Sequence, residues 1–382
     1  MTRLYMDYNA TAPPAPGVAE AIAEFFQHHW GNPSSSHAEG RRARIACEQA
    51  RARVAHALDC QTEEVVFTSG GSEADALAIR GLFESGRVDA LVLGGLEHPA
   101  VMATARWLAD HRNAKVQLTR VDRHGRVTAE AVAEALDRLE RHDRPLVSVM
   151  LAQNELGTLN PLDEISAITR ARGALLHSDA VAAFGKIPIS VSNLGVDLLT
   201  VSAHKIGGPA GAGALIVRRE LQPAAFCQGG HQEQGRRPGT EPLSLLVGFG
   251  VAAQAVPQRV ASCASAAPMR ARLETQLMAT IPDVLVAGLE APRLPNTVAA
   301  IFRDVVGTSV VAACDAAGLS ISAGAACHSA TGSPTMRALA LPDGYREGLV
   351  RLSVAPTVQA GEIDRAVTIL ANAVGALRGA AA

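Results

Sequence analysis

The stretch LLHSDAVAAFGKIPISVSNLGVDLLTVSAHKIGG, residues 175–208, decides the fold of this chain. It contains two short apolar runs, at residues 175–176 and 198–201, and each run is flanked by polar or turn residues. Short apolar runs bounded in this way are typical of buried strands in a parallel sheet. We therefore expect two buried parallel strands here, with the residues that follow them at one edge of the sheet.

An acid follows the first predicted strand and an amine follows the second. Asp179 comes after the first run, and Lys205 comes after the second within the sequence SAHK. Ligands of open parallel sheets bind outside the carboxyl ends of the strands, so both side chains can face one ligand. An acid that pairs with a pyridinium nitrogen and an amine that forms an imine are what pyridoxal phosphate (PLP) requires. The stretch therefore predicts a PLP site.

Lysine usage supports a role for Lys205. The chain has only three lysines, Lys115, Lys186 and Lys205, among 35 basic residues. Arginine stays protonated and cannot form an imine, so it cannot replace a cofactor lysine. The alternative is that Lys205 is a surface lysine in a loop. Its place after a buried strand and before a glycine-rich turn favours the cofactor role.

Composition narrows the class of protein. A length of 382 residues favours two domains, and 48% hydrophobic residues suffice for sizeable cores. A net charge of −2 and 3% aromatic residues give no indication of a nucleic-acid or membrane surface. The N-terminus lacks a signal-peptide core, and no apolar run is long enough to span a membrane. Six cysteines without a CxxC pair predict neither a metal site nor a disulfide framework. We therefore expect a reduced, cytoplasmic protein.

Alternating strand and helix patterns predict an α/β fold with a largely parallel sheet covered on both faces. The first helices are expected at residues 16–29 and 41–58, separated by the polar turn GNPSSSH. Further strands are expected at residues 64–67, 90–93, 115–119, 146–151 and 214–217.

The pattern changes after about residue 257. We expect a long amphipathic helix at residues 261–280 and a closing helix at residues 360–377. Shorter strands are expected at residues 297–302, 320–321 and 350–354. The expected division is an N-terminal segment, residues 1–15, that packs with a smaller α+β domain at residues 258–382, and a large domain at residues 16–257.

Three further features suggest chemistry. The turn Gly70-Gly71-Ser72 opens a helix after a strand, and a helix N-terminus binds phosphate well, although such a turn can also serve as a simple cap. His98 follows another strand, where it can stack on a planar cofactor or have only a structural role. Cys327 lies among glycine and small polar residues, which predicts a loop and makes its thiol a candidate nucleophile.

Taken together, these motifs resemble the cysteine desulfurases, PLP enzymes of the class-V aminotransferase family. The resemblance implies the type I fold of PLP-dependent transferases, with a mostly parallel seven-stranded sheet in the large domain. The matching stretches run in the family's order over nearly the whole chain: MDYNATAP, GNPSSSH, VVFTSGGSEADALAIRG, EHPAV, QNELG, HSDAVAAFGK, SAHKIGGPAGAGAL, RRPGT and SAGAACHS.

The resemblance implies a role for each cofactor-binding residue. Lys205 would hold PLP through an imine, and Asp179 would pair with the pyridine nitrogen. His98 would stack on the ring and help in proton transfer. Thr240 would reach the phosphate of the partner subunit, which implies a homodimer. The phosphate within the same subunit would be bound by Gly71, Ser72, Ser202 and His204.

The same resemblance implies how the substrate, L-cysteine, is bound and cleaved. Asn154 and Arg351 would hold its carboxylate, with Asn154 also binding the cofactor and Asn9 also binding the substrate. Arginine suits this task because its planar fork matches a carboxylate. Cys327 would attack the substrate sulfur, releasing alanine and leaving a persulfide. The persulfide would then pass to a sulfur-acceptor protein.

Three positions depart from the family pattern. Ala182 stands where the family usually has a glutamine that bonds the cofactor's phenolic oxygen. Ala210 replaces a usual lysine, and His328 follows the nucleophile in place of a small residue. The stretch from Cys327 to Pro334 keeps the length of the housekeeping group that supplies sulfur to scaffold proteins.

Other functions remain open at this point. A selenocysteine lyase or an aminotransferase of the same class would share the cofactor site, but an aminotransferase needs no cysteine in the loop. A non-catalytic subunit with a PLP fold is favoured only by Ala182. The destination of the sulfur also stays open among iron–sulfur cluster assembly, nitrogenase maturation, tRNA thiolation and DNA phosphorothioation.

Overall fold

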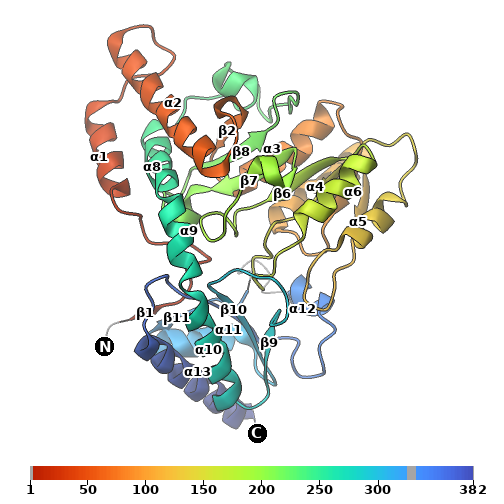
Figure 1. The fold of residues 1–382 in the computed structure, drawn as a ribbon, viewed down its shortest axis with the longest axis vertical. Coiled ribbons are helices and arrows are strands. Elements are labelled where there is room, and N and C mark those ends of the chain that lie inside the picture. The colour runs from red at the N-terminus through yellow and green to blue at the C-terminus, as the bar shows by residue number, and fades with distance from the viewer. Residues whose placement is uncertain (1–2, 325–332, 382) are drawn as a thin grey trace.

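The computed structural model describes residues 3–324 and 333–381. An upper part of sheet and helices and a smaller lower part are joined by three successive helices (Figure 1). These helices are α8 (Leu243–Gln254), α9 (Val256–Ala264) and α10 (Ala267–Thr280). Both ends of the chain lie in the lower part (Figure 1).

The upper part is organised around a seven-stranded sheet in the order β2-β8-β7-β6-β5-β3-β4. All neighbouring pairs from β7 to β4 are parallel, and β8 runs antiparallel to both of its neighbours. This confirms the predicted α/β class and mostly parallel sheet. The strands are β2 (Val65–Thr68), β3 (Ala90–Leu93), β4 (Lys115–Leu118), β5 (Pro145–Ser148), β6 (Leu175–Asp179), β7 (Leu198–Ser202) and β8 (Gly213–Val217).

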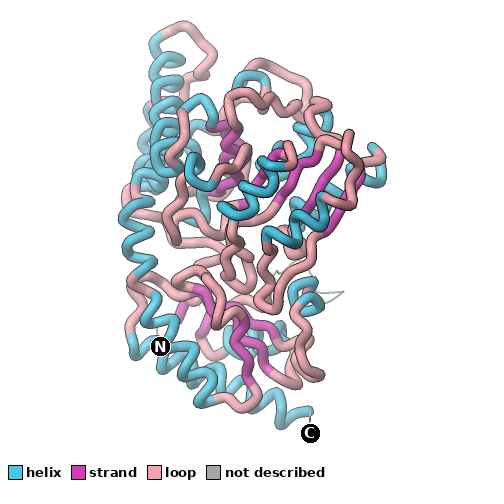
Figure 2. The backbone as a smooth tube through the Cα atoms, turned by 45° about the vertical axis from the view of Figure 1, so that its right-hand side comes forward, coloured by secondary structure: helices cyan, strands magenta, loops and turns pink. Residues whose placement is uncertain are grey.

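Helices cover both faces of this sheet (Figure 2). Successive strand residues point to opposite faces, so Leu91 packs in one core and Val92 in the other. The helices α3 (Gly71–Glu84) and α4 (Pro99–Arg112) cover the first face. The opposite core includes residues of α1 (Val18–His28), α2 (Ala38–Leu58), α5 (Ala129–Leu136), α6 (Leu162–Ala171), α7 (Val191–Leu194) and α8. Burial on both faces explains why these strands are almost continuously apolar.

The lower part has an antiparallel sheet in the order β12-β10-β9. Its apolar core also includes Leu4 and Met6, because β1 (Leu4–Tyr5) pairs in parallel with β11 (Leu319–Ser320). The predicted domain boundary after residue 257 falls inside α9 and stays a prediction. The remaining elements are β9 (Val284–Ala287), β10 (Thr297–Phe302), α11 (Gly307–Ala316), α12 (Pro334–Ala338), β12 (Leu349–Ser353) and α13 (Ala360–Ala381).

The prediction of a single helix at residues 261–280 is wrong. The structure has α9 and α10 there, separated at residues 265–266. Pro268 lies in the first turn of α10, where a missing N–H costs nothing. Within one continuous helix, its ring would clash with the carbonyl of Ala264 and remove a hydrogen bond.

No single helix in the described part of the chain is long and apolar enough to cross a membrane. The pair Leu243–Gln254 and Val256–Thr280, bent by 50°, passes that test only when taken together.

Candidate active site

The candidate site begins at the carboxyl ends of β6 and β7. These strands are parallel neighbours, and Asp179, the last residue of β6, pairs in register with Thr200 of β7. After β7 ends at Ser202, the short helix η2 (Ala203–Ile206) carries His204 and Lys205. The structure therefore brings the acid and the amine of residues 175–208 to the same edge of the sheet.

Asp179 is a buried acid with few donors. Its side chain is 5% exposed, and its carboxylate accepts a hydrogen bond from the Val181 N–H at 2.8 Å. Burial raises the pKa of Asp179, whereas the charges of His98 and Lys205 and the Val181 hydrogen bond oppose this rise. A cation placed against this carboxylate would favour its ionised form. A protonated pyridine nitrogen is such a cation.

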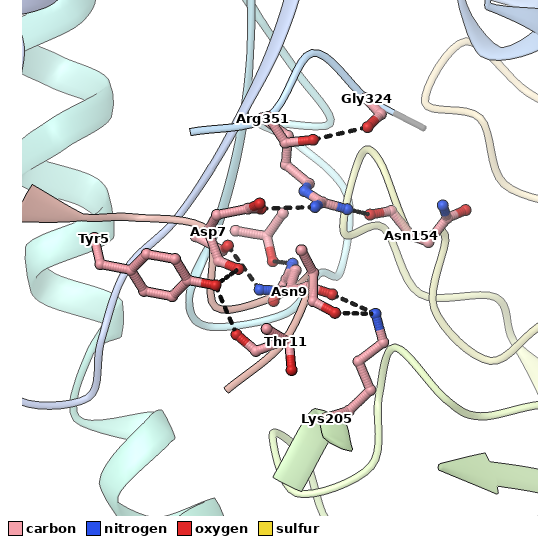
Figure 3. Close-up of polar contacts among 12 residues, drawn as sticks. Tyr5, Asp7, Asn9, Thr11, Asn154, Lys205, Gly324 and Arg351 are labelled. Atoms are coloured by element: carbon pink, nitrogen blue, oxygen red, sulfur yellow. Dashed lines mark hydrogen bonds and ion pairs between the residues drawn. The ribbon is translucent and has the colours of Figure 1, made fainter. Parts of the chain in front are cut away.

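Lys205 is a partly buried amine that reaches the N-terminal segment. Its Nζ donates to the backbone oxygens of Asn9 at 2.6 Å and Ala10 at 2.9 Å (Figure 3). Burial, and next the positive charge of Arg351, lower the pKa of Lys205 to about 8. At pH 7 about a tenth of such an amine is neutral, against less than about a thousandth for an ordinary lysine. The neutral form is the one that attacks an aldehyde.

The start of α3 is shaped for an anion. It follows β2 through Gly70, whose φ of 157° is readily available only to glycine. A Cβ atom at Gly71 would lie 2.8 Å from the Val181 side chain and 3.9 Å from that of Ser202. The glycine thus allows Val181 to lie close against this helix N-terminus, where free N–H groups favour a phosphate.

The two histidines of the predicted site lie at this edge as well. His98 caps α4, and its Nδ1 accepts from the Ala100 N–H at 3.1 Å. Ligand atoms of His98, Asp179 and Asp75 all lie within 4.8 Å of one another. Burial, followed by the charges of the nearby lysines, lowers the pKa of His204 to about 4. His204 is therefore neutral at pH 7 and can offer a phosphate a hydrogen bond but no charge.

The lower part contributes Arg351, which lies on β12 and is buried. Its guanidinium donates to the backbone oxygen of Asn154 at 2.7 Å and to the Asp7 carboxylate at 2.9 Å (Figure 3). Asn9 is also buried, and its side chain donates to Thr297 at 2.7 Å. The structure therefore brings Asn154 and Arg351 into contact and holds Asn9 beside them.

Thr240 is not part of this group. Thr240 lines a separate hollow of about 380 Å³ with Phe26 and Trp30. Cys327 and His328 lie outside the described residues. Gly324 is the last described residue before them, and the adjoining Ser322 pairs with Arg351 through two backbone hydrogen bonds.

Sequence reasoning assigned no role to three buried polar residues behind the site. Asp75 lies in the second turn of α3, and its buried Oδ1 has no hydrogen-bond partner among the described residues. His177 bridges Ser148 at 2.8 Å and Thr200 at 3.1 Å, and burial lowers its pKa to about 3. Lys186 donates to the Ala182 backbone oxygen at 2.7 Å. The only available signal was their position inside apolar stretches.

The residues present fit PLP. The buried carboxylate of Asp179 would be stabilised by a further cation, Lys205 supplies an amine of lowered pKa, and the N-terminus of α3 offers free N–H groups beside Val181 and Ser202. Together they match a pyridinium, an aldehyde and a phosphate. A mostly parallel sheet with this set at its carboxyl edge defines a class of PLP-dependent enzymes.

Comparison with known proteins names the family. The chain matches the aminotransferase class-V family over residues 4–366 and belongs to it. It is 35% identical to the cysteine desulfurase of Gluconacetobacter diazotrophicus, over 99% of this chain and 95% of the relative. It is 36% identical to an IscS-like cysteine desulfurase of Mycobacterium tuberculosis, over 99% and 98% of the two chains.

Solved structures agree with the fold. A NifS-like protein superposes with a TM-score of 0.90 at 29% identity, covering 98% of this chain and 100% of that one. SspA, solved in complex with cysteine, gives a TM-score of 0.80 at 31% identity, covering 93% of this chain and 99% of its own. The resemblance inferred from the motifs is thereby confirmed, and the protein is a PLP-dependent enzyme.

Proposed function

We propose that the protein is a cysteine desulfurase, which removes sulfur from L-cysteine and releases L-alanine. The observation that carries this proposal is one buried site that joins Lys205 and Asp179 to Arg351. The first two suit an amino-acid substrate on PLP, and Arg351 suits that substrate's carboxylate. The relatives named cysteine desulfurase span nearly the whole chain, which supports the same activity.

The cofactor, when bound, withdraws electrons from the substrate's α-carbon. Asp179 keeps a proton on the ring nitrogen, because a buried carboxylate is stabilised by that positive charge. Lys205 holds the cofactor, and its amine then takes and returns the proton of the α-carbon. A pKa of about 8 suits both tasks near neutral pH. His98, near Asp179, assists the proton transfer.

Arg351 and Asn154 orient the substrate. Arg351 can still offer N–H groups after its bonds to Asp7 and Asn154, since a guanidinium carries five. A carboxylate held there fixes the amino acid at two points, with its amino group toward Lys205. Fixing the substrate in this way lowers the entropic cost of reaching the reactive geometry.

Cys327 completes the reaction as the sulfur acceptor. Its thiolate attacks the substrate sulfur, so that an S–S bond forms while the Cβ–S bond breaks. The electron pair of the broken bond, with a proton, ends on the β-carbon of alanine. The enzyme is left as a persulfide, whose outer sulfur passes to a thiol of a sulfur-acceptor protein. A cytoplasmic location is part of this proposal.

We also propose that the active form is a homodimer. Phe26 and Trp30 are 73% and 76% exposed, and they line one hollow with Thr240. Large exposed apolar side chains of this kind suit a protein interface. Contact across this hollow would let Thr240 reach the phosphate in the partner's site. Sedimentation of the wild type and of a Trp30→Ser variant tests the interface.

The activity is tested by supplying the PLP-loaded enzyme with L-cysteine and no oxo acid. A desulfurase releases alanine and sulfide under these conditions when a reducing thiol is present. An aminotransferase stops after one turnover, because it needs an oxo acid to continue. A selenocysteine lyase releases alanine only from selenocysteine, so parallel assays with both amino acids separate the two.

A further inference from the structure

The N-terminal segment Tyr5–Thr11 runs along the site although it is remote from it in sequence (Figure 3). Lys205 donates to the backbone of Asn9 and Ala10, and the Tyr5 hydroxyl donates to the backbone oxygens of Asp7 and Thr11. The segment is therefore tied to the site by its main chain. Asp7 adds a side-chain contact.

The Asp7 carboxylate forms an ion pair with Arg351, with Oδ1 at 2.9 Å from Nη2. The side chain of Asp7 is 19% exposed and that of Arg351 is 6% exposed, so both are largely removed from water. The backbone oxygen of Asn154 accepts a hydrogen bond from Nη1 of Arg351. The buried Nε of Arg351 has no hydrogen-bond partner among the described residues. Two of the three guanidinium nitrogens are therefore fixed, one by the N-terminal segment and one by the backbone of Asn154.

Such a pair has a physical consequence. Arginine has many rotamers, and ordering it at the moment of binding weakens affinity. Because the Arg351 guanidinium is already paired and fixed before the substrate binds, binding does not have to order it. A buried guanidinium without its counter-ion would also be strongly unfavourable, so loss of Asp7 would let Arg351 move toward water.

We propose that Asp7 is a positioning residue that fixes the Arg351 guanidinium for the carboxylate of the amino-acid substrate. The inference rests on the proposed function, because it takes Arg351 as the substrate's carboxylate partner. Asp7 acts through Arg351 and does not touch the reacting atoms. The competing interpretation is that Asp7 only fastens the N-terminal segment to the lower part.

The test measures ligand binding by the PLP-loaded Asp7→Asn variant. We expect its Kd for L-alanine, and its KM for L-cysteine, to rise about tenfold to a hundredfold, with kcat changed by less than about threefold. Its Kd for ethylamine, which lacks the carboxylate, should stay at the wild-type value. Asp7→Glu keeps the charge and should recover part of the affinity.

Asp315→Asn is the matched control. Asp315 forms an exposed ion pair with Arg3, which fastens the chain just before Tyr5–Thr11 and does not involve Arg351. We expect this variant to bind alanine as the wild type does. An unchanged alanine Kd in Asp7→Asn, or an equal loss for alanine and ethylamine, would overturn the inference. If Asp7→Asn does not fold, the Kd values of Asp7→Glu and Asp7→Ser for alanine and ethylamine test the inference in the same way.

This test is separate from that of the proposed function. A wild-type enzyme that binds alanine but releases none from cysteine would contradict the desulfurase activity. The alanine and ethylamine constants would still decide the role of Asp7.

Discussion

The two sides of the active site are built differently. On the sheet side, Asp179 and Lys205 lie within one stretch, residues 175–208, and adjacent parallel strands bring them together. On the other side, Asp7 and Arg351 are 344 residues apart and meet where the N-terminal segment runs beside β12. In our proposal the sheet side holds the groups for the cofactor, and the second side holds those for the substrate carboxylate. Substitutions on the two sides should therefore change kcat and KM differently.

The largest effect is expected on the sheet side from Lys205→Arg. Arginine keeps the charge but cannot form an imine. The purified variant should lack the visible absorbance band of bound PLP and should release no alanine from cysteine. A spectrum of the variant after incubation with PLP is the measurement. A retained band would move the cofactor lysine to Lys115 or Lys186.

Asp179→Asn should bind PLP but turn over slowly. A neutral amide does not hold the pyridine nitrogen protonated, so we expect kcat to fall on the order of 10²-fold or more. KM should change much less, because the carboxylate partners are untouched. Steady-state kinetics on the fully loaded variant provide the measurement. A near-wild-type kcat would assign Asp179 a purely structural role at the end of β6.

The comparison also shows what could be predicted from sequence. The sheet side was predictable because apolar periodicity places strands, and strand ends place Asp179 and Lys205. The ion pair of Asp7 and Arg351 was not predictable from the residues, since no local pattern links the two ends of a chain. Arg351 itself was assigned only through the family resemblance.

Other differences have local causes. The helix expected at residues 261–280 is two helices because Pro268 starts a new one. The edge strand β9 was missed although its four apolar residues, bounded by turn residues, fit the same pattern as the predicted strands. Asp75 and His177 are invisible to pattern reasoning, which assigns buried stretches to the core whatever polar residues they contain.

Arg351→Gln tests whether the two sides interact. Removing this charge should raise the pKa of Lys205 above about 8, although burial, the larger cause, still holds it below 10.5. A higher pKa leaves less neutral amine, so PLP should load more slowly at pH 7. The rate of appearance of the visible band, followed against pH, should then level off at a higher pH than in the wild type. Identical profiles would show that the two sides are electrostatically independent.

The smallest effect is expected from Ala182→Gln. A glutamine there would donate to the cofactor's phenolic oxygen and stabilise its anionic form, which lowers the pKa of the bound cofactor. We expect a fall of about one unit or less, because one hydrogen bond contributes roughly 1 kcal/mol. Spectrophotometric titration of both proteins measures it. Superimposable curves would mean that another donor already makes this bond.

The central claim is that sulfur leaves L-cysteine for the Cys327 thiol at this site. Mass spectrometry of the PLP-loaded enzyme after brief incubation with L-cysteine, without added thiol, tests it most directly. The account predicts one additional sulfur atom on the peptide that contains Cys327, an equal amount of alanine, and neither product in Cys327→Ala. Alanine formed by Cys327→Ala at the wild-type rate, or a wild-type Cys327 peptide without added sulfur, would contradict it.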